Sequence, residues 1–297
     1  MMGRCAGDGA DASAYRQVER KYKRKAVAQS SAGRRRAARH PGDPPADPYG
    51  DVVDLGRHVP HRARYHVDRV EGHPGLHIIV NAVPVDEQIH WAQAAMSRYA
   101  DSPYTNLSCE PNPKQLTRPA LFDRLRWANL GRHYDWTNRS YLDVDNLGEL
   151  PVELVDLYDR VLADAGIPCS GRAQAAIVNF YPAGTRMGGH VDDAEGDMES
   201  PIVSLSLGCS CIYLQGGPSR DQRPTPFWLR SGDIVIMSGP ARRCYHGVAL
   251  VASGTLPDDV RSAAPDNVVD YLSNARININ LRCVDASQKC TTRTGSP

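Results

Sequence analysis

His190 and Asp192 stand one residue apart at the end of NFYPAGTRMGGHVD, the stretch from Asn179 to Asp192. In an extended strand, residues i and i+2 point to the same face, so this imidazole and this carboxylate can be directed at one point. The pair is two-thirds of the His, His, carboxylate set that holds a non-haem Fe(II) and leaves coordination positions open for co-substrates. Because His-x-Asp is common by chance, the metal hypothesis needs a third ligand, an anion site and a suitable scaffold.

The third ligand has to come from a different strand. His246 meets this requirement, because it lies in RRCYHGVAL at the start of a strand predicted after the hairpin segment SGDIVIMSGP. Of the remaining eight histidines, seven lie between residues 40 and 90 and one is His133, in loops or in the N-terminal half of the chain. The alternative is that His246 is an ordinary neutral imidazole of the core.

An anion site is predicted in ARININLR, where Arg276, Asn278 and Arg282 are evenly spaced and share one face of a strand. An Fe(II) oxygenase of this kind usually takes 2-oxoglutarate as co-substrate. Arginine suits the distal carboxylate of 2-oxoglutarate because the guanidinium is always charged and can donate two hydrogen bonds to one carboxylate. Two inward arginines are costly unless they meet anions. The alternative is a solvent-facing arginine face, but the opposite face is apolar and also needs burial.

The scaffold is predicted from the spacing of apolar residues. Helical spacing covers 11–25, the segment after Pro84, 119–127 and 151–166, and short strands are predicted at 174–181, 187–192, 202–215, 226–230, 233–239, 245–250 and 275–284, besides one at Leu76. Many short strands after a helical half predict a mainly β protein with α elements, namely an antiparallel jelly roll with helices packed outside. We expect a basic, partly disordered extension over 1–50, a helical and aromatic-loop lid region over 51–170, the roll over 171–284 and a tail over 285–297.

Composition limits the possible classes of protein. The 297 residues are 41% hydrophobic and 23% charged, and no run approaches the 18 apolar residues of a transmembrane helix. The eight cysteines have no paired spacing, which favours reduced thiols of an intracellular protein. Residues 1–40 carry eleven Lys or Arg against three acids, and clusters such as KYKRK (21–25) suit phosphate contacts or nuclear import, or are simply a solvated tail. We expect a nuclear or cytoplasmic location, with the mitochondrion also open.

Taken together, these motifs resemble the AlkB family of Fe(II)/2-oxoglutarate-dependent dioxygenases, and most of all the first AlkB homologue of animals. The family pattern of Asn-x-Tyr, His-x-Asp, Gly-Asp, a distal Tyr-His-Gly and a final Arg-x-Asn-x-x-x-Arg is matched in order, over roughly residues 50 to 284. The resemblance implies a double-stranded β-helix, which is a jelly roll, with Fe(II), 2-oxoglutarate and O2 as cofactor and co-substrates. It implies iron ligands at His190, Asp192 and His246, and a 2-oxoglutarate site made by Asn179, Tyr181, Arg276, Asn278 and Arg282.

The resemblance also implies the reaction, which is oxidative removal of N-methyl groups from nucleic-acid bases as formaldehyde, with succinate as co-product. The expected substrates are N6-methyladenine in DNA or 1-methyladenine in tRNA, presented as a flipped or single-stranded base. Tyr134 and Trp136 are candidates to stack on the base, with packing of the lid as the alternative. The bacterial repair enzymes carry an acid two residues beyond the metal Asp, where Ala194 stands here, so we consider the flanking Asp193 and Glu195 as substrate-binding residues.

Two other functions compete with nucleic-acid demethylation. One is a 2-oxoglutarate oxygenase that acts on protein side chains such as those of histones. The other is a nucleic-acid-binding jelly roll without turnover, against which the intact ligand set argues. The basic N-terminal segment and the aromatic loop favour nucleic acid as the partner, and no membrane partner is expected.

Overall fold

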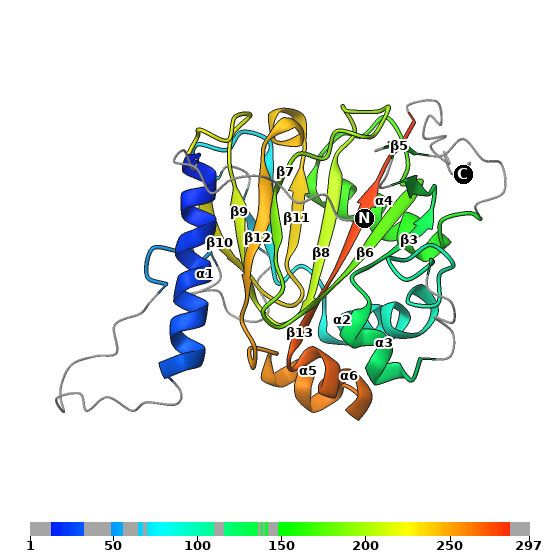
Figure 1. Cartoon of the computed structure of the whole chain (residues 1–297). Coiled ribbons are helices and arrows are strands. Elements are labelled where there is room, and N and C mark those ends of the chain that lie inside the picture. Colours follow the sequence, from blue (N-terminus) through cyan, green and yellow to red (C-terminus); the bar gives the residue numbers. More distant parts are fainter. Residues whose placement is uncertain are drawn as a thin grey trace.

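The computed structural model describes residues 13–32, 49–55, 65–67, 70–109, 116–135, 138, 140–141 and 148–285. Two antiparallel sheets face each other and form the predicted jelly roll (Figure 1). The larger sheet has the order β1 (Tyr65–Val67), β2 (Leu76–Val80), β11 (Ile234–Met237), β8 (Ile202–Gly208), β13 (Ala275–Arg282), β6 (Ala175–Pro182) and β3 (Trp127–Gly131). The smaller sheet has the order β10 (Thr225–Leu229), β9 (Cys211–Gln215), β12 (His246–Val251) and β7 (Met187–His190). A separate hairpin joins β4 (Tyr134–Asp135) to β5 (Ser140–Tyr141).

Helices cover the outer face of the larger sheet. They are α2 (Val85–Ala94), which continues as a π turn over Ala95–Tyr99, α3 (Arg118–Arg124), α4 (Val152–Ala165), α5 (Asp258–Ala263) and α6 (Asp266–Leu272). The predicted helix after Pro151 is confirmed, and it ends at Gly166, whose φ of 66° suits a glycine. Within the described residues, no helix combines the length and the apolar character needed to span a bilayer.

Helices α5 and α6 were not predicted. They lie between β12 and β13, over residues 258–272, where the apolar spacing in the sequence predicts neither a helix nor a strand. Each helix is preceded by a proline and begins with an aspartate, Pro257-Asp258 and Pro265-Asp266, and this is an ordinary start signal for a helix. The signal was present, but each helix is too short for its apolar period to stand out.

Two neighbouring strands of the larger sheet, β13 and β6, separate polar from apolar side chains with a period of two. On β13 the apolar residues Ile277, Ile279 and Leu281 pack under the helices, and the polar residues face the space between the sheets. The neighbouring β6 is in register, so that Arg276 lies opposite Tyr181 and Asn278 lies opposite Asn179. The expectation that ARININLR is buried on both faces is therefore confirmed, because every residue of β13 is buried.

The single strand predicted over 202–215 is in fact two strands in different sheets. The chain leaves the larger sheet at Gly208, where φ is 88°, and enters the smaller sheet at Cys211. This backbone conformation is accessible to glycine at low cost but not to residues with a Cβ. The Gly208 turn thus carries the chain from one face of the site to the other.

Helix α1 (Ala14–Ala32) packs on the outside of the smaller sheet, where Figure 1 shows it in blue beside β10, β9 and β12. Tyr15, Val18 and Tyr22 recur at helical spacing and are buried against Ile212 and other apolar residues of β9 and β12. Lys21 and Lys25 form ion pairs with Asp51. The charged helix expected near 11–25 is therefore an amphipathic helix docked on the roll.

Replacement of Gly208 by alanine should destabilise the fold strongly. The added Cβ would lie 2.6 Å from the carbonyl oxygen of Ala275 and 2.8 Å from Leu272 Cδ2, in addition to the strain at positive φ. We expect Gly208→Ala to lower the free energy of unfolding by about 3 kcal/mol or more in urea titrations. Gly72→Ala is the matched control, because Gly72 has a φ of 80° but no atom near its missing Cβ, and it should cost only about 1 kcal/mol. Equal losses would contradict the role of the turn.

Candidate active site

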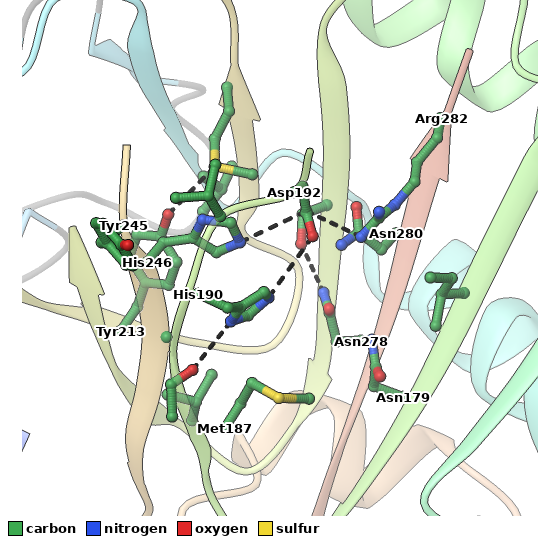
Figure 2. Close-up of a pocket in the computed structure, with 18 of the residues that line it drawn as sticks. Asn179, Met187, His190, Asp192, Tyr213, Tyr245, His246, Asn278, Asn280 and Arg282 are labelled. Atoms are coloured by element: carbon green, nitrogen blue, oxygen red, sulfur yellow. Dashed lines mark hydrogen bonds and ion pairs between the residues drawn. The ribbon is translucent and has the colours of Figure 1, made fainter. Parts of the chain in front are cut away.

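Three side chains from two adjacent strands meet between the sheets. His190 ends β7, Asp192 follows it by two residues, and His246 begins β12, directly opposite His190 in the strand register. One ligand atom from each residue lies within 4.8 Å of the others. His190 Nε2 is 3.6 Å from Asp192 Oδ1, and His246 Nε2 is 3.5 Å from Asp192 Oδ2 (Figure 2). The arrangement that the spacing predicted is therefore present as a compact triad.

Backbone carbonyls orient both imidazoles. His190 Nδ1 lies 2.9 Å from the carbonyl oxygen of Gly188, and His246 Nδ1 lies 3.3 Å from that of Cys244. Because a carbonyl oxygen only accepts hydrogen bonds, each Nδ1 is the donor in its contact, and each Nε2 faces Asp192. This tautomer and this kind of support are typical of histidine ligands to a metal.

The charge state of the triad suits a divalent cation. The side chain of His190 is 39% exposed, but its ring lies in the wall of the cavity, where desolvation and repulsion from His246 lower its pKa to about 4. Burial alone would raise the pKa of Asp192, yet the Arg282 guanidinium and His246 hold it well below its usual range. At neutral pH the set is therefore one neutral imidazole at His190 with an ionised carboxylate beside it, which a hard or borderline cation such as Fe(II) complements.

Asp192 is also the first member of a buried ionic network. Arg282 donates to Asp192 Oδ2 at 2.9 Å and to Glu195 Oε1 at 2.7 Å. Glu195 accepts further hydrogen bonds from Arg242 at 3.3 Å and from the Tyr141 hydroxyl at 3.0 Å. Arg242, 1% exposed, also donates to the carbonyl oxygen of Asp192 at 2.9 Å. The network connects the metal carboxylate with the β4–β5 hairpin.

This network corrects one expectation. Glu195 was considered a substrate-binding residue, but its carboxylate is fully buried and binds two arginines, so it holds the site together instead. The guanidinium of Arg242 is buried within the same network, whereas its neighbour Arg243 is exposed. Nothing in the local sequence distinguishes these two adjacent arginines, because the partners of Arg242 lie more than 40 residues away.

A cavity of about 480 Å³ opens beside the triad and contains the predicted 2-oxoglutarate residues. Asn179, Tyr181, Arg276, Asn278 and Arg282 all line it. Figure 2 shows Asn179, Asn278 and Arg282 projecting from the larger sheet toward the histidines of the smaller one. The predicted shared faces of β6 and β13 are thus brought together around one space.

Arg276 is suited to bind a carboxylate of a dicarboxylate such as 2-oxoglutarate. It is 2% exposed, its Nη2 donates to Ser206 Oγ at 3.0 Å, and its guanidinium lies 5.3 Å from the centre of the Tyr181 ring. Its Nε and Nη1 are buried without any hydrogen-bond partner among the described residues. A buried cation with two unused donors is unfavourable unless an anion completes it. Burial raises the pKa of Tyr181 to about 12, so its hydroxyl is protonated and can donate as well. The residues present fit the distal carboxylate of 2-oxoglutarate.

Arg282 differs from Arg276 in its partners. Both of its terminal nitrogens are used by Asp192 and Glu195, and only its Nε is without a partner. It can therefore contribute one donor to a co-substrate, while its main contact is with the metal carboxylate.

The predicted substrate residues fall into different places. Tyr134 lines the cavity from β4, with its ring centre 5.3 Å from that of Tyr141, and Asp193 is exposed at the rim of the same cavity. Trp136 lies outside the described residues. Tyr245 also lines the cavity, and the Arg220 guanidinium lies 5.0 Å from the centre of its ring. The sequence motifs did not single out this aromatic and basic pair as a contact for the substrate base.

The buried network gives a pH-dependent prediction. Burial raises the pKa of Glu195, but the neighbouring Arg282 and Arg242 guanidinium groups lower it by more. The pKa of Glu195 in the folded protein therefore lies below the ordinary 4.5. Its stabilising contribution is therefore complete above pH 4.5 and is lost as the pH falls toward the folded pKa. Glu195→Gln should lower the free energy of unfolding by about 3 kcal/mol at neutral pH, because two buried arginines lose their shared anion, and by less under acidic conditions. Urea titrations across the acidic range would measure this.

The control for this variant is Glu199→Gln. Glu199 forms an exposed ion pair with Arg243, with 76% of its side chain accessible, so little change is expected. An equal loss in both variants, or a Glu195→Gln loss that is independent of pH, would contradict the network's role.

Comparisons with known proteins agree with this geometry. The model of the 2OG-Fe(II) oxygenase superfamily matches residues 75–282. The DNA N(6)-methyladenine demethylase ALKBH1A of Arabidopsis thaliana is 27% identical over 93% of this chain and 97% of its own length. The human nucleic acid dioxygenase ALKBH1 is 31% identical over 74% of this chain and 67% of its own length, and the tRNA demethylase abh1 of Schizosaccharomyces pombe is 37% identical over 58% of each.

A solved structure shows the same fold. The structure of OsALKBH1 superimposes with a TM-score of 0.56 at 22% identity, over 70% of this chain and 96% of that one. The family model covers the whole span from β2 to β13, including the triad and the arginine strand. The chain therefore belongs to the 2OG-Fe(II) oxygenase superfamily, and within it to the AlkB family and its ALKBH1-like members.

Proposed function

We propose that the protein oxidatively demethylates N-methylated bases of nucleic acids and releases formaldehyde and succinate. The observation that carries the proposal is the His190, Asp192 and His246 triad, which opens on a cavity where a buried arginine lacks an anion. When bound, Fe(II), 2-oxoglutarate and O2 supply an oxidant that hydroxylates a methyl C–H bond. A hydroxymethyl group on nitrogen then breaks down to formaldehyde and the free amine.

The protein's own residues have separate tasks in this proposal. His190, Asp192 and His246 hold the metal, and Arg276 with Tyr181 and Asn179 binds the co-substrate. Arg282 and Glu195 keep the Asp192 carboxylate in place and ionised. The apolar residues Leu229, Val235 and Met237 in the cavity wall limit access of water, so that the oxidant meets the substrate methyl group.

Relatives support a nucleic-acid substrate. The Arabidopsis relative is named for N6-methyladenine in DNA, the fission yeast relative for tRNA, and a relative from Pyricularia oryzae, 31% identical over 68% of this chain, for N6-methyladenosine in RNA. We propose methylated adenine in DNA or tRNA as the substrate class. The two relatives whose names specify a base both name N6-methylated adenine.

The base has to be unpaired to reach the triad. The triad lies in a cavity between two sheets, which a base stacked inside a duplex does not reach, so the nucleotide is flipped or comes from a single strand. Tyr134 would stack on one face of the base, and Asp193 at the rim would accept hydrogen bonds from its amino groups. Both roles follow from the position of these residues in the cavity wall.

Demethylation is tested by incubating the purified protein with Fe(II), 2-oxoglutarate and single-stranded oligonucleotides that carry N6-methyladenine or 1-methyladenine. We expect formaldehyde and succinate in equal amounts, with loss of the methyl group measured by mass spectrometry. Asp192→Ala should abolish turnover because the metal loses its carboxylate, and Asp193→Ala should retain succinate formation but lose demethylation.

The outcomes separate the competing functions. Succinate formed with histone peptides but with no methylated oligonucleotide would favour a protein oxygenase over this proposal. Metal-loaded protein that makes no succinate with any substrate would favour a binding module without turnover. Full activity of Asp192→Ala would contradict the metal site itself.

Phosphate contacts are predicted on the exposed face of α1. Lys23 and Arg24 are exposed there, and Arg220 and Arg223 are exposed on the loop between β9 and β10, where Arg220 also lines the cavity. Arg24→Glu should weaken binding of single-stranded DNA of any sequence and reduce the salt slope of log K by about one. Arg261→Glu is the matched control, because Arg261 is exposed on α5 and does not line the cavity. Fluorescence anisotropy over a range of salt concentrations measures both, and equal effects would contradict a phosphate-binding face on α1.

A further inference from the structure

The strand that carries His190 lies at the edge of its sheet. Among the described strands, β7 is the last of the smaller sheet and pairs on one side only, with β12. Gly189, the residue before His190, has both of its backbone groups held by side chains instead of by a strand. Its N–H donates to Glu19 Oε1 at 2.6 Å, and its carbonyl oxygen accepts from Arg220 Nη2 at 2.9 Å. Glu19 belongs to α1, 170 residues earlier in the chain.

The ring and hydroxyl of Tyr15, also on α1, lie close to three glycines, where a side chain would have to stand. A Cβ on Gly189 would come within 2.4 Å of this ring, and a Cβ on Gly216 within 3.0 Å. A Cβ on Gly247 would come within 3.2 Å of the Tyr15 hydroxyl. These glycines belong to three adjacent strand segments, and two of them adjoin His190 and His246 in sequence. Tyr15 itself is 1% exposed, and its hydroxyl donates to the carbonyl oxygen of Leu214 at 3.3 Å.

These contacts stiffen a segment that is otherwise weakly held. No strand within the described part of the chain pairs with the outer side of β7, and Gly188-Gly189 is a flexible pair. His190 is also the most exposed of the three ligands, at 39% against 7% for Asp192 and 8% for His246. The position of its ring therefore depends on the backbone just before it, which Glu19 and Arg220 fix from outside the roll.

We propose that α1 is a positioning element of the metal site, in which Glu19 and Tyr15 hold Gly189 and so set the place of His190 relative to Asp192 and His246. Neither residue touches the metal or the substrate. This inference rests on the proposed role of His190 as a ligand, but not on the identity of the substrate. It adds to the phosphate contact proposed at Arg24, which the helical repeat places on the side of α1 opposite Tyr15.

The test measures metal binding and backbone protection without turnover. Mn(II) serves as the probe, and its affinity is measured by calorimetry on the full chain, together with amide hydrogen exchange of the segment that contains Gly189. Glu19→Ala should weaken Mn(II) affinity about tenfold, as supporting groups of metal ligands commonly do, and should accelerate exchange at Gly189. Glu19→Gln keeps an oxygen acceptor and should remain close to wild type. Glu19→Asp keeps the charge but is too short to reach, and should behave like Glu19→Ala.

Arg16→Ala is the control, because Arg16 is an exposed residue of the same helix. If Glu19→Ala and Glu19→Asp bind Mn(II) as tightly as Arg16→Ala, or leave exchange at Gly189 unchanged, the positioning role is wrong. A merely structural role would lower the melting temperature without the loss of affinity, and that result would also overturn it. Wild-type protein that binds Mn(II) but demethylates no oligonucleotide would leave this inference standing and reject the proposed function.

Discussion

The site depends on the cost of burying positive charge between two sheets. β13 places Arg276 and Arg282 on its inner face, where neither guanidinium can be solvated by bulk water. Arg282 is compensated by Asp192 and Glu195 within the protein. Among the described residues, Arg276 contacts only a serine and an aromatic ring, and two of its donors have no partner. Arg282 thus neutralises the carboxylate of the metal site, whereas the charge of Arg276 is balanced only by a bound anion.

The same strand also explains why fold and site cannot be separated. Its apolar residues belong to the hydrophobic core that the sheet shares with α2, α4, α5 and α6, of which α4 and α6 lie against β13 itself. Its polar residues line the co-substrate side of the cavity. A shift of one residue in its register would bury the arginines under helices and turn the isoleucines into the cavity. The helices therefore do more than stabilise the sheet, because they fix which face of β13 the site receives.

Much of the candidate site could be predicted because its residues are encoded in short, regular spacings. His190 with Asp192, Asn179 with Tyr181, and the alternate residues of ARININLR each lie two apart on one strand, and the structure brings all of them to one cavity. Glu195, Arg242 and Glu19 were missed or misplaced, because their roles come from partners between 42 and 170 residues away. The break at Gly208 was missed because the apolar run continues through it, and only the backbone angle shows the change of sheet.

The docking of α1 has a consequence for the order in which the molecule assembles. The helix is synthesised before every strand, yet Tyr15 bonds to Leu214, 199 residues later, and Glu19 bonds to Gly189. Contacts so distant in sequence form only after the intervening chain has closed its loops, so this surface is completed late in folding. The roll can then form its ladders first, with the edge of β7 open, and α1, although synthesised before the strands of the roll, docks among the last of the elements.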